Sequence, residues 1–312
     1  MASLRDVRPV LKSHGVWAFL NCIRQQMNED GIYVWASALA YSWLFSIFPF
    51  LILLLSLVPY LPAKTKENAR SAVTQFISQM LGKEASTLND NVTQVLSNPR
   101  TGWLGIGLVV SIWVASGGMS MTMSALDRCY DVKQTRSYIH QRAVAIVLTI
   151  GVTIGVLFLI VLLPVGEAVG AWGAAHGIIT RRLYFAFDAA RYVLSIIFAL
   201  GVTAFIYHFG PNIRQRFNLF SPGAIFTAVV WLLTNFIFRV YVDRYARYDR
   251  TYGTVGGAAI LLLFFYIDGL VLLVGAEINS EIDFERLGVG PGCRDFTGKA
   301  GANKPIELTK EL

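Results

Sequence analysis

Six long stretches of this chain are apolar and almost free of charged side chains. No charged residue lies between Asp30 and Lys64, and only Asp268 interrupts the last stretch. A helix needs about 20 apolar residues to cross the roughly 30 Å hydrocarbon core of a bilayer. The stretches therefore predict six membrane-spanning helices, with cores near residues 36–60, 103–125, 143–163, 192–211, 220–240 and 256–277.

Composition agrees with this pattern. Charged residues make up 15% of the 312-residue chain and hydrophobic residues 54%, whereas soluble domains have about 25% charged residues. The fold class expected is therefore all-α, a polytopic membrane protein with one membrane domain over residues 1–286. Residues 287–312 are rich in Gly, Pro and Lys, which predicts a disordered cytoplasmic tail.

Amphipathic segments flank the first span. Residues 10–27 place apolar side chains at helical spacing among Lys12 and Arg24, which predicts a helix in the cytoplasmic interface or, as an alternative, an extension of the helix bundle. The first outer loop, 61–102, shows the same periodicity twice, so two short amphipathic helices are expected there.

An even number of spans places both termini on one side of the membrane. Lys and Arg are denser in the short loops 126–142 and 211–220 than in the loops of the other side, which favours cytoplasmic N- and C-termini. The net charge of +7 comes from basic residues that lie between apolar stretches. Membrane phospholipids are therefore the expected partner, rather than nucleic acid. A homo-oligomer is left open.

Polar residues inside spans are candidates for function, because charged groups in lipid normally face protein or water. Asn235, Arg239 and Asp243 recur every four residues and share one helix face. They form either the wall of a polar cavity or an interfacial cluster at the headgroups. Asp268, near Tyr266, is a candidate proton relay, ion ligand or partner of a basic group; the alternative is a structural pair with an Arg.

Two further groups of residues stand out in the spans. Tyr41, Ser46 and Pro49 interrupt the first apolar stretch, so we expect them to face the bundle, with a kink at Pro49. The small residues Gly117, Gly118, Gly151 and Gly155 predict close helix packing, although the first pair could instead unwind its helix. Glu277 lies on the opposite side of the last helix from Asp268 and is expected at the cytoplasmic interface.

Enzymatic patterns are missing from the sequence. The four histidines are far apart, and no metal-ligand spacing, nucleophile elbow, P-loop or dinucleotide turn is found. We therefore expect no catalytic residues, no bound metal, no cofactor and no enzyme.

Several stretches together resemble one family. They are E-D-G-I-Y-V-W-A-S-A-L-A-Y-S-W-L-F-S-I-F-P-F-L, S-G-G-M-S-M-T-M-S-A-L-D-R-C-Y-D-V, Y-H-F-G-P-N with S-P-G-A, and Y-G-T-V-G-G-A-A-I-L-L-L-F-F-Y-I-D-G-L-V-L-L-V-G-A-E-I-N. In this order, over residues 24–285, they resemble the YihY/BrkB family of bacterial inner-membrane proteins. Phe264 and Asp268 stand where the family pattern usually has a tryptophan and a small hydroxyl residue, so the resemblance assigns Asp268 no shared role.

The resemblance implies a six-helix protein of the bacterial inner membrane with both ends in the cytoplasm. Family members have been labelled ribonuclease BN, a serum-resistance virulence factor, and an exporter of lipopolysaccharide precursors. The function expected here is transport or export of a lipid or other amphiphile. The alternative is a non-transporting factor for envelope integrity or assembly. A ribonuclease is not expected, because clustered metal ligands are missing.

Overall fold

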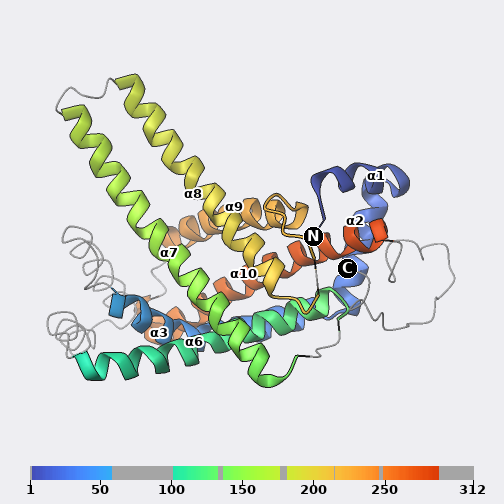
Figure 1. The fold of residues 1–312 in the computed structure, drawn as a ribbon, viewed down its shortest axis with the longest axis horizontal. Helices are drawn as coiled ribbons and strands as arrows, with labels where there is room; N and C mark the ends of the chain where they lie inside the picture. The colour runs from blue at the N-terminus through green and yellow to red at the C-terminus, as the bar shows by residue number, and fades with distance from the viewer. Residues whose placement is uncertain are drawn as a thin grey trace.

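The chain folds as helices throughout the part that the structure describes, residues 2–57, 101–132, 136–175, 181–213, 215–245 and 249–287 of a computed structural model. The helices, shown in Figure 1, are α1 (Leu4–His14), α2 (Val16–Glu29), α3 (Ile32–Leu57), α6 (Thr101–Cys129), α7 (Tyr138–Ala175), α8 (Arg181–Phe209), α9 (Pro222–Tyr245) and α10 (Asp249–Leu287). An all-helical membrane fold is thus confirmed.

Four of these helices are long and apolar enough to cross a membrane. The stretches that qualify are Ile32–Phe50, Val109–Cys129, Tyr138–Gly155 and Gly256–Arg286, and shorter apolar stretches occupy Ile196–Phe209 and Pro222–Phe238. The six predicted spans fall on α3, α6, α7, α8, α9 and α10 in turn, and the division into six spans stays a prediction. The amphipathic helices predicted in 61–102 and the tail predicted for 287–312 lie outside the described residues, apart from their first or last positions.

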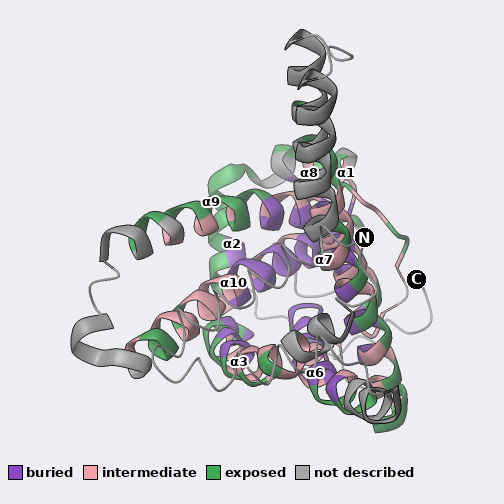
Figure 2. Ribbon diagram, turned by 90° about the vertical axis from the view of Figure 1, so that its left-hand side faces the viewer, coloured by how far each residue is buried: buried purple, intermediate pink, exposed green. Residues whose placement is uncertain are grey.

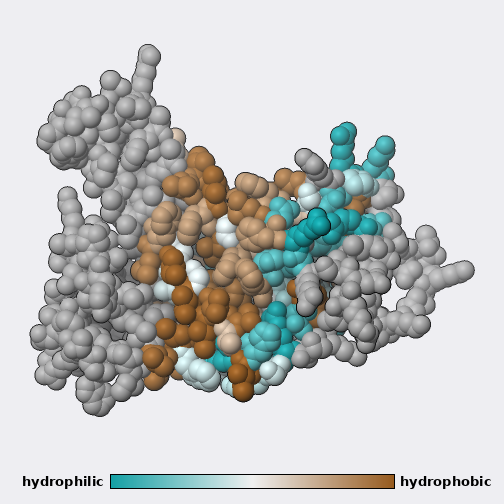
Figure 3. All heavy atoms as spheres, viewed as in Figure 1, coloured by the Kyte–Doolittle hydropathy of each residue, from teal (hydrophilic) through white to brown (hydrophobic). Residues whose placement is uncertain are grey.

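The six long helices form a ring. Contacts run from α3 to α6, α7, α8, α9 and α10 in succession, and from α10 back to α3. In Figure 1, α7 and α8 run side by side and diverge from α3 and α6 toward one end of the molecule. A brown apolar zone crosses the middle of Figure 3, and polar residues gather at the end where α1 and α2 lie. This distribution is that of a protein with a lipid-facing belt.

The N-terminal helices pack against the end of α10. Phe19 and Ile23 of α2 are buried in one cluster with Ile282 of α10, whereas Trp17 and Leu20 of α2 are exposed. The amphipathic segment is divided at Gly15, whose φ of 81° ends α1 before α2 begins. The beginning of the chain and the end of α10 therefore lie at the same end of the ring.

The closest helix approach joins α9 to α10. A methyl group added at Gly275 would overlap the hydroxyls of Thr227 and Tyr207, and one added at Gly223 would overlap the carbonyl of Gly275. The buried hydroxyl of Tyr207 lies 2.6 Å from the Thr227 hydroxyl and donates to the Leu272 carbonyl at 2.6 Å. These bonds fasten α8 to the α9–α10 pair. Figure 2 shows buried residues along α10 on this side.

The glycines singled out in the sequence lie at two other helix contacts. Gly118 of α6 faces Ser46 of α3, since its added methyl would lie 2.8 Å from the Ser46 hydroxyl. Gly151 and Gly155 of α7 face α8, where Phe205 and Val202 approach them. Gly117 has Ser46 and Arg142 at about 4 Å, and α6 continues as a helix through both Gly117 and Gly118.

Substituting Gly275→Ala should destabilise the protein, because the methyl has no space between α9 and α10. Overpacking of this kind costs about 1–3 kcal/mol, which should appear as a lower midpoint of thermal unfolding in detergent. Gly257→Ala on the same helix is the control, since nothing lies within 4 Å of its added methyl. Equal midpoints for the two variants would contradict the close approach.

Candidate functional site

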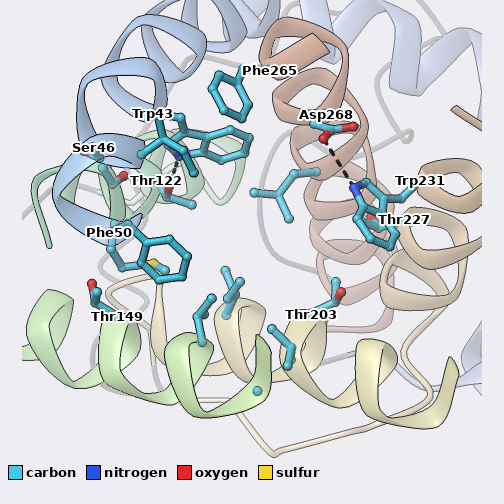
Figure 4. A pocket seen from close by; sticks show the side chains of 18 of the residues that line it. Trp43, Ser46, Phe50, Thr122, Thr149, Thr203, Thr227, Trp231, Phe265 and Asp268 are labelled. Carbon is cyan, nitrogen blue, oxygen red and sulfur yellow. Dashed lines mark hydrogen bonds between the residues drawn. The ribbon is translucent and has the colours of Figure 1, made fainter. Parts of the chain in front are cut away.

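A cavity of about 410 Å³ lies inside the ring of helices. All six long helices contribute to its wall, which makes it a central feature of the bundle rather than a groove between two neighbours. Figure 4 shows side chains from opposite sides of the ring pointing into it. The labelled lining residues are Trp43, Ser46, Phe50, Thr122, Thr149, Thr203, Thr227, Trp231, Phe265 and Asp268.

One charged side chain, Asp268 of α10, lines the cavity among the described residues. The indole N–H of Trp231 donates to Asp268 Oδ2 at 3.4 Å, as the dashed line in Figure 4 shows. The other oxygen, Oδ1, is buried without a hydrogen-bond partner in the described part of the chain. An unpaired carboxyl oxygen in apolar surroundings is unfavourable, so this group is poised for a further donor.

Most of the threonine hydroxyls of the wall are already engaged as donors, whereas Ser46 donates to no partner among the described residues. Thr122, Thr149 and Thr203 each donate to the carbonyl four residues earlier in their own helix, at 2.9, 2.7 and 3.0 Å. The Trp43 indole donates to the Thr122 oxygen at 3.0 Å. The cavity therefore presents acceptor oxygens and aromatic surface, with few free donors.

Eight residues were proposed from the sequence for a cavity, and the structure describes the side chains of six of them. Two of these six, Ser46 and Asp268, line the cavity. Tyr41 is 63% exposed on the outer surface beside Phe45, with ring centroids 4.7 Å apart. Pro49 lies within α3, whose described residues stay helical on both sides of it. Tyr266 packs against the main hydrophobic core.

Asn235, the first residue of the cluster proposed on α9, does not line this cavity. Its side-chain amide donates to the Trp231 carbonyl of the preceding turn at 2.7 Å. The side chains of Arg239 and Asp243 lie outside the described residues. No described arginine pairs with Asp268, contrary to the alternative proposed from the sequence. Its hydrogen-bond donor among the described side chains is Trp231.

Sequence reasoning missed Trp231 and the threonines of the cavity wall. Trp231 is flanked on both sides by apolar residues, Val230 and Leu232, in a stretch without charged side chains. A signal was nevertheless present in the spacing, because Thr227 and Trp231 are four residues apart and so share one face of α9. Gly223, one turn earlier on that face, makes the contact with α10.

A second polar cluster closes the end of the ring where α1 and α2 lie. Asp127 of α6 accepts a hydrogen bond from the Asn212 backbone at 2.5 Å, and Arg136 donates to the carbonyls of Gly210 and Pro211, both at 2.9 Å. Arg128 forms an ion pair of 3.3 Å with Asp30. The stretches around these residues carry the family resemblance, and the fold brings them together.

Glu277 does not lie at an interface with solvent, contrary to the sequence-based expectation. Its side chain is 0% exposed, and neither carboxyl oxygen has a hydrogen-bond partner in the described part of the chain. The reason is tertiary packing, because Glu277 lies beside the buried Cys129 of α6 and near Asp30, which follows α2. Asn279, two residues later, accepts from the Gly223 backbone at 2.8 Å.

Comparison with known proteins finds one family over most of the chain. The family model described as "Virulence factor BrkB" matches residues 23–291. "Putative ribonuclease-like protein YfkH" of Bacillus subtilis is 32% identical over 246 residues, which cover 78% of this chain and 88% of the relative. A "UPF0761 membrane protein" of Pseudoalteromonas translucida is 25% identical over 274 residues, with 83% and 84% covered. One of Vibrio vulnificus is 27% identical over 278 residues, with 85% and 82% covered. No solved structure matches significantly.

Asp30, which precedes the first spanning helix, should make stability depend on pH. Burial raises the pKa of its carboxyl from 3.8 to about 6, and the nearby Asp131 adds to this, whereas Gln26 and Arg128 oppose it. Because the raised pKa belongs to the folded state, that state binds the proton more tightly, and the free energy of unfolding should fall as pH rises from about 4 to 6. The contribution is about 1–3 kcal/mol.

Thermal unfolding of Asp30→Asn at pH 4 and pH 7 measures this effect. The variant should lose less stability than the wild type over that interval, because Asn does not titrate. Glu29→Gln is the control, because this exposed neighbour is the smallest of the contributions that raise the pKa of Asp30, and it should keep most of the wild-type pH dependence. Parallel pH profiles for all three proteins would refute the role of Asp30.

Proposed function

The chain belongs to the BrkB family of membrane proteins, and from this premise we propose that it transports a lipid or other amphiphile across the bacterial inner membrane. The cavity is the observation that carries the proposal. It combines a mainly apolar wall with one carboxylate and several hydroxyl oxygens, which suits a molecule with an apolar tail and a polar head.

The position of the cavity supports transport over simple attachment of a lipid. Each of the six long helices reaches the cavity, so a change in its occupancy would bear on every pair of neighbours in the ring. A lipid that only anchors the protein needs no cavity lined by all six long helices. Alternating access in transporters commonly centres on a site inside the helix bundle.

The positions of the basic loops support one orientation of the protein in the membrane. Arg136, between α6 and α7, bonds to the turn between α8 and α9, and Asn218 of that turn donates to the Ala2 carbonyl at 2.8 Å. Both loops rich in Lys and Arg thus lie at the end with the N-terminal helices. By the positive-inside rule, we place this end, with both termini, in the cytoplasm.

The proposal includes no enzymatic step. One relative carries the name "Putative ribonuclease-like protein YfkH", and the present chain is proposed to act without nuclease activity. A non-transporting role in envelope integrity or assembly is the alternative. Measurement of transport distinguishes the two.

Blocking the cavity should abolish transport by the full-length protein in liposomes. We would measure transfer of fluorescent phospholipids and alkyl-chain amphiphiles across the bilayer for wild type and Thr203→Trp. Flux should fall by roughly tenfold or more in the variant, because the added indole would occupy space that the substrate needs.

Ile197→Trp is the matched control, because it adds the same side chain to α8 at an exposed position. It should keep the wild-type flux, which would separate blockage of the cavity from a general effect on α8. If the wild type moves none of the probes faster than empty liposomes do, transport is refuted and the envelope-factor alternative is favoured.

A further inference from the structure

The polar groups that face the cavity are almost all hydrogen-bond acceptors. Both indole N–H groups of the wall are used within the protein, by the Thr122 hydroxyl and by Asp268. The hydroxyl protons of Thr149 and Thr203 are directed to their own helix, which leaves their oxygen lone pairs for a ligand. A headgroup that brings its own donors therefore fits this wall better than one that requires donors, for which the Ser46 hydroxyl is the donor left over in the described lining.

The charge of the cavity lining also restricts which headgroups fit. Asp268 is the one charged residue in the described lining, and no Lys, Arg or His accompanies it there. A phosphate or sulfate head would meet a like charge without a compensating cation. A cationic head would instead give Asp268 the partner that Trp231 supplies in part, since Trp231 bonds only to Oδ2 and leaves Oδ1 unpaired.

Aromatic rings complete the surroundings. Trp43 and Phe50 come from α3, Trp231 from α9 and Phe265 from α10. The rings of Trp43 and Phe265 meet edge to face, with centroids 6.2 Å apart. The faces of such rings attract cations through their quadrupole, most effectively where water is excluded. Figure 4 shows Phe265 and Trp43 on the opposite side of the cavity from Trp231.

From these observations we infer that the cavity binds amphiphiles with a cationic, ammonium-type headgroup, with Asp268 as the ion-pair partner and the aromatic side chains around the head and tail. The inference rests on the proposed function and names its substrate class. Rotation of the carboxyl about its terminal torsion, which is soft, can present either oxygen to the ligand. The apolar remainder of the wall, to which all six long helices contribute, receives the alkyl chain.

Binding of three probes with the same tail tests the headgroup. Full-length protein in nanodiscs of a neutral diacyl glycolipid, which has no ammonium headgroup to compete, would be titrated with radiolabelled dodecyltrimethylammonium, dodecyl glucoside or dodecyl sulfate, and binding to empty nanodiscs subtracted. The cationic probe should bind the wild type at least about tenfold more tightly than the neutral probe, and the anionic probe most weakly.

Substitution of the carboxylate locates the effect. Asp268→Asn keeps the size of the side chain and an oxygen for Trp231, so affinity for the cationic probe should fall about tenfold or more while the neutral probe changes less than about twofold. Glu29→Gln, which removes an exposed carboxylate on α2 outside the cavity lining, should leave all three affinities unchanged. If Asp268→Asn does not fold, the order of the three probes on the wild type still decides.

The outcomes separate this inference from the proposed function. Equal binding of the cationic and neutral probes, or unchanged cation affinity in Asp268→Asn, would overturn the headgroup assignment and leave an amphiphile cavity in place. Preference for dodecyl sulfate would overturn it as well. If no probe binds above the empty-nanodisc level, both the headgroup assignment and the proposed amphiphile site are refuted.

Discussion

The contact between α9 and α10 is the constraint on which the cavity depends. Gly223 and Gly275 allow two backbones to approach so closely that neither tolerates a methyl group. That approach brings Thr227 to Tyr207, whose hydroxyl also reaches the Leu272 carbonyl. Small residues serve this purpose in membranes because lipid supplies no hydrophobic drive for helices to associate, so packing and hydrogen bonds must do so.

The same contact fixes the orientation of the carboxylate. Gly275 and Leu272 lie within two turns of Asp268 on α10, so anchoring the helix there sets the direction in which Asp268 points. On α9, Trp231 follows Thr227 by one turn, and it bonds to Asp268 at 3.4 Å. The cavity wall and the helix contact are thus consecutive parts of one interface, which places a polar group in the apolar interior at a defined position.

The sequence predicts the six long helices well but not their rotation about the helix axis. Charge-free stretches identify α3 and α6 to α10, because an apolar run of about 20 residues matches the length that a helix needs to cross a bilayer. Tyr41 and Ser46 show that the sequence does not reveal which way a side chain faces. They are five residues apart, which turns a helix by about 140°. Ser46 therefore faces the cavity while Tyr41 faces outward. In a helix that is apolar on all sides, periodicity cannot tell these directions apart.

The two carboxylates Asp268 and Glu277 of α10 show that tertiary packing, which the sequence alone does not reveal, decides whether a charged side chain is exposed. Asp268 and Glu277 are nine residues apart, which places them on opposite sides of the helix and roughly 14 Å apart along it. From the sequence alone, Glu277 looked like the group that would meet water. Instead Cys129 of α6 and Asp30 lie beside it, and it is fully buried, while Asp268 faces the cavity. Exposure of a charged group near a helix end therefore depends on a segment distant in sequence, and the carboxylate in the middle of the apolar stretch is the one that faces the cavity.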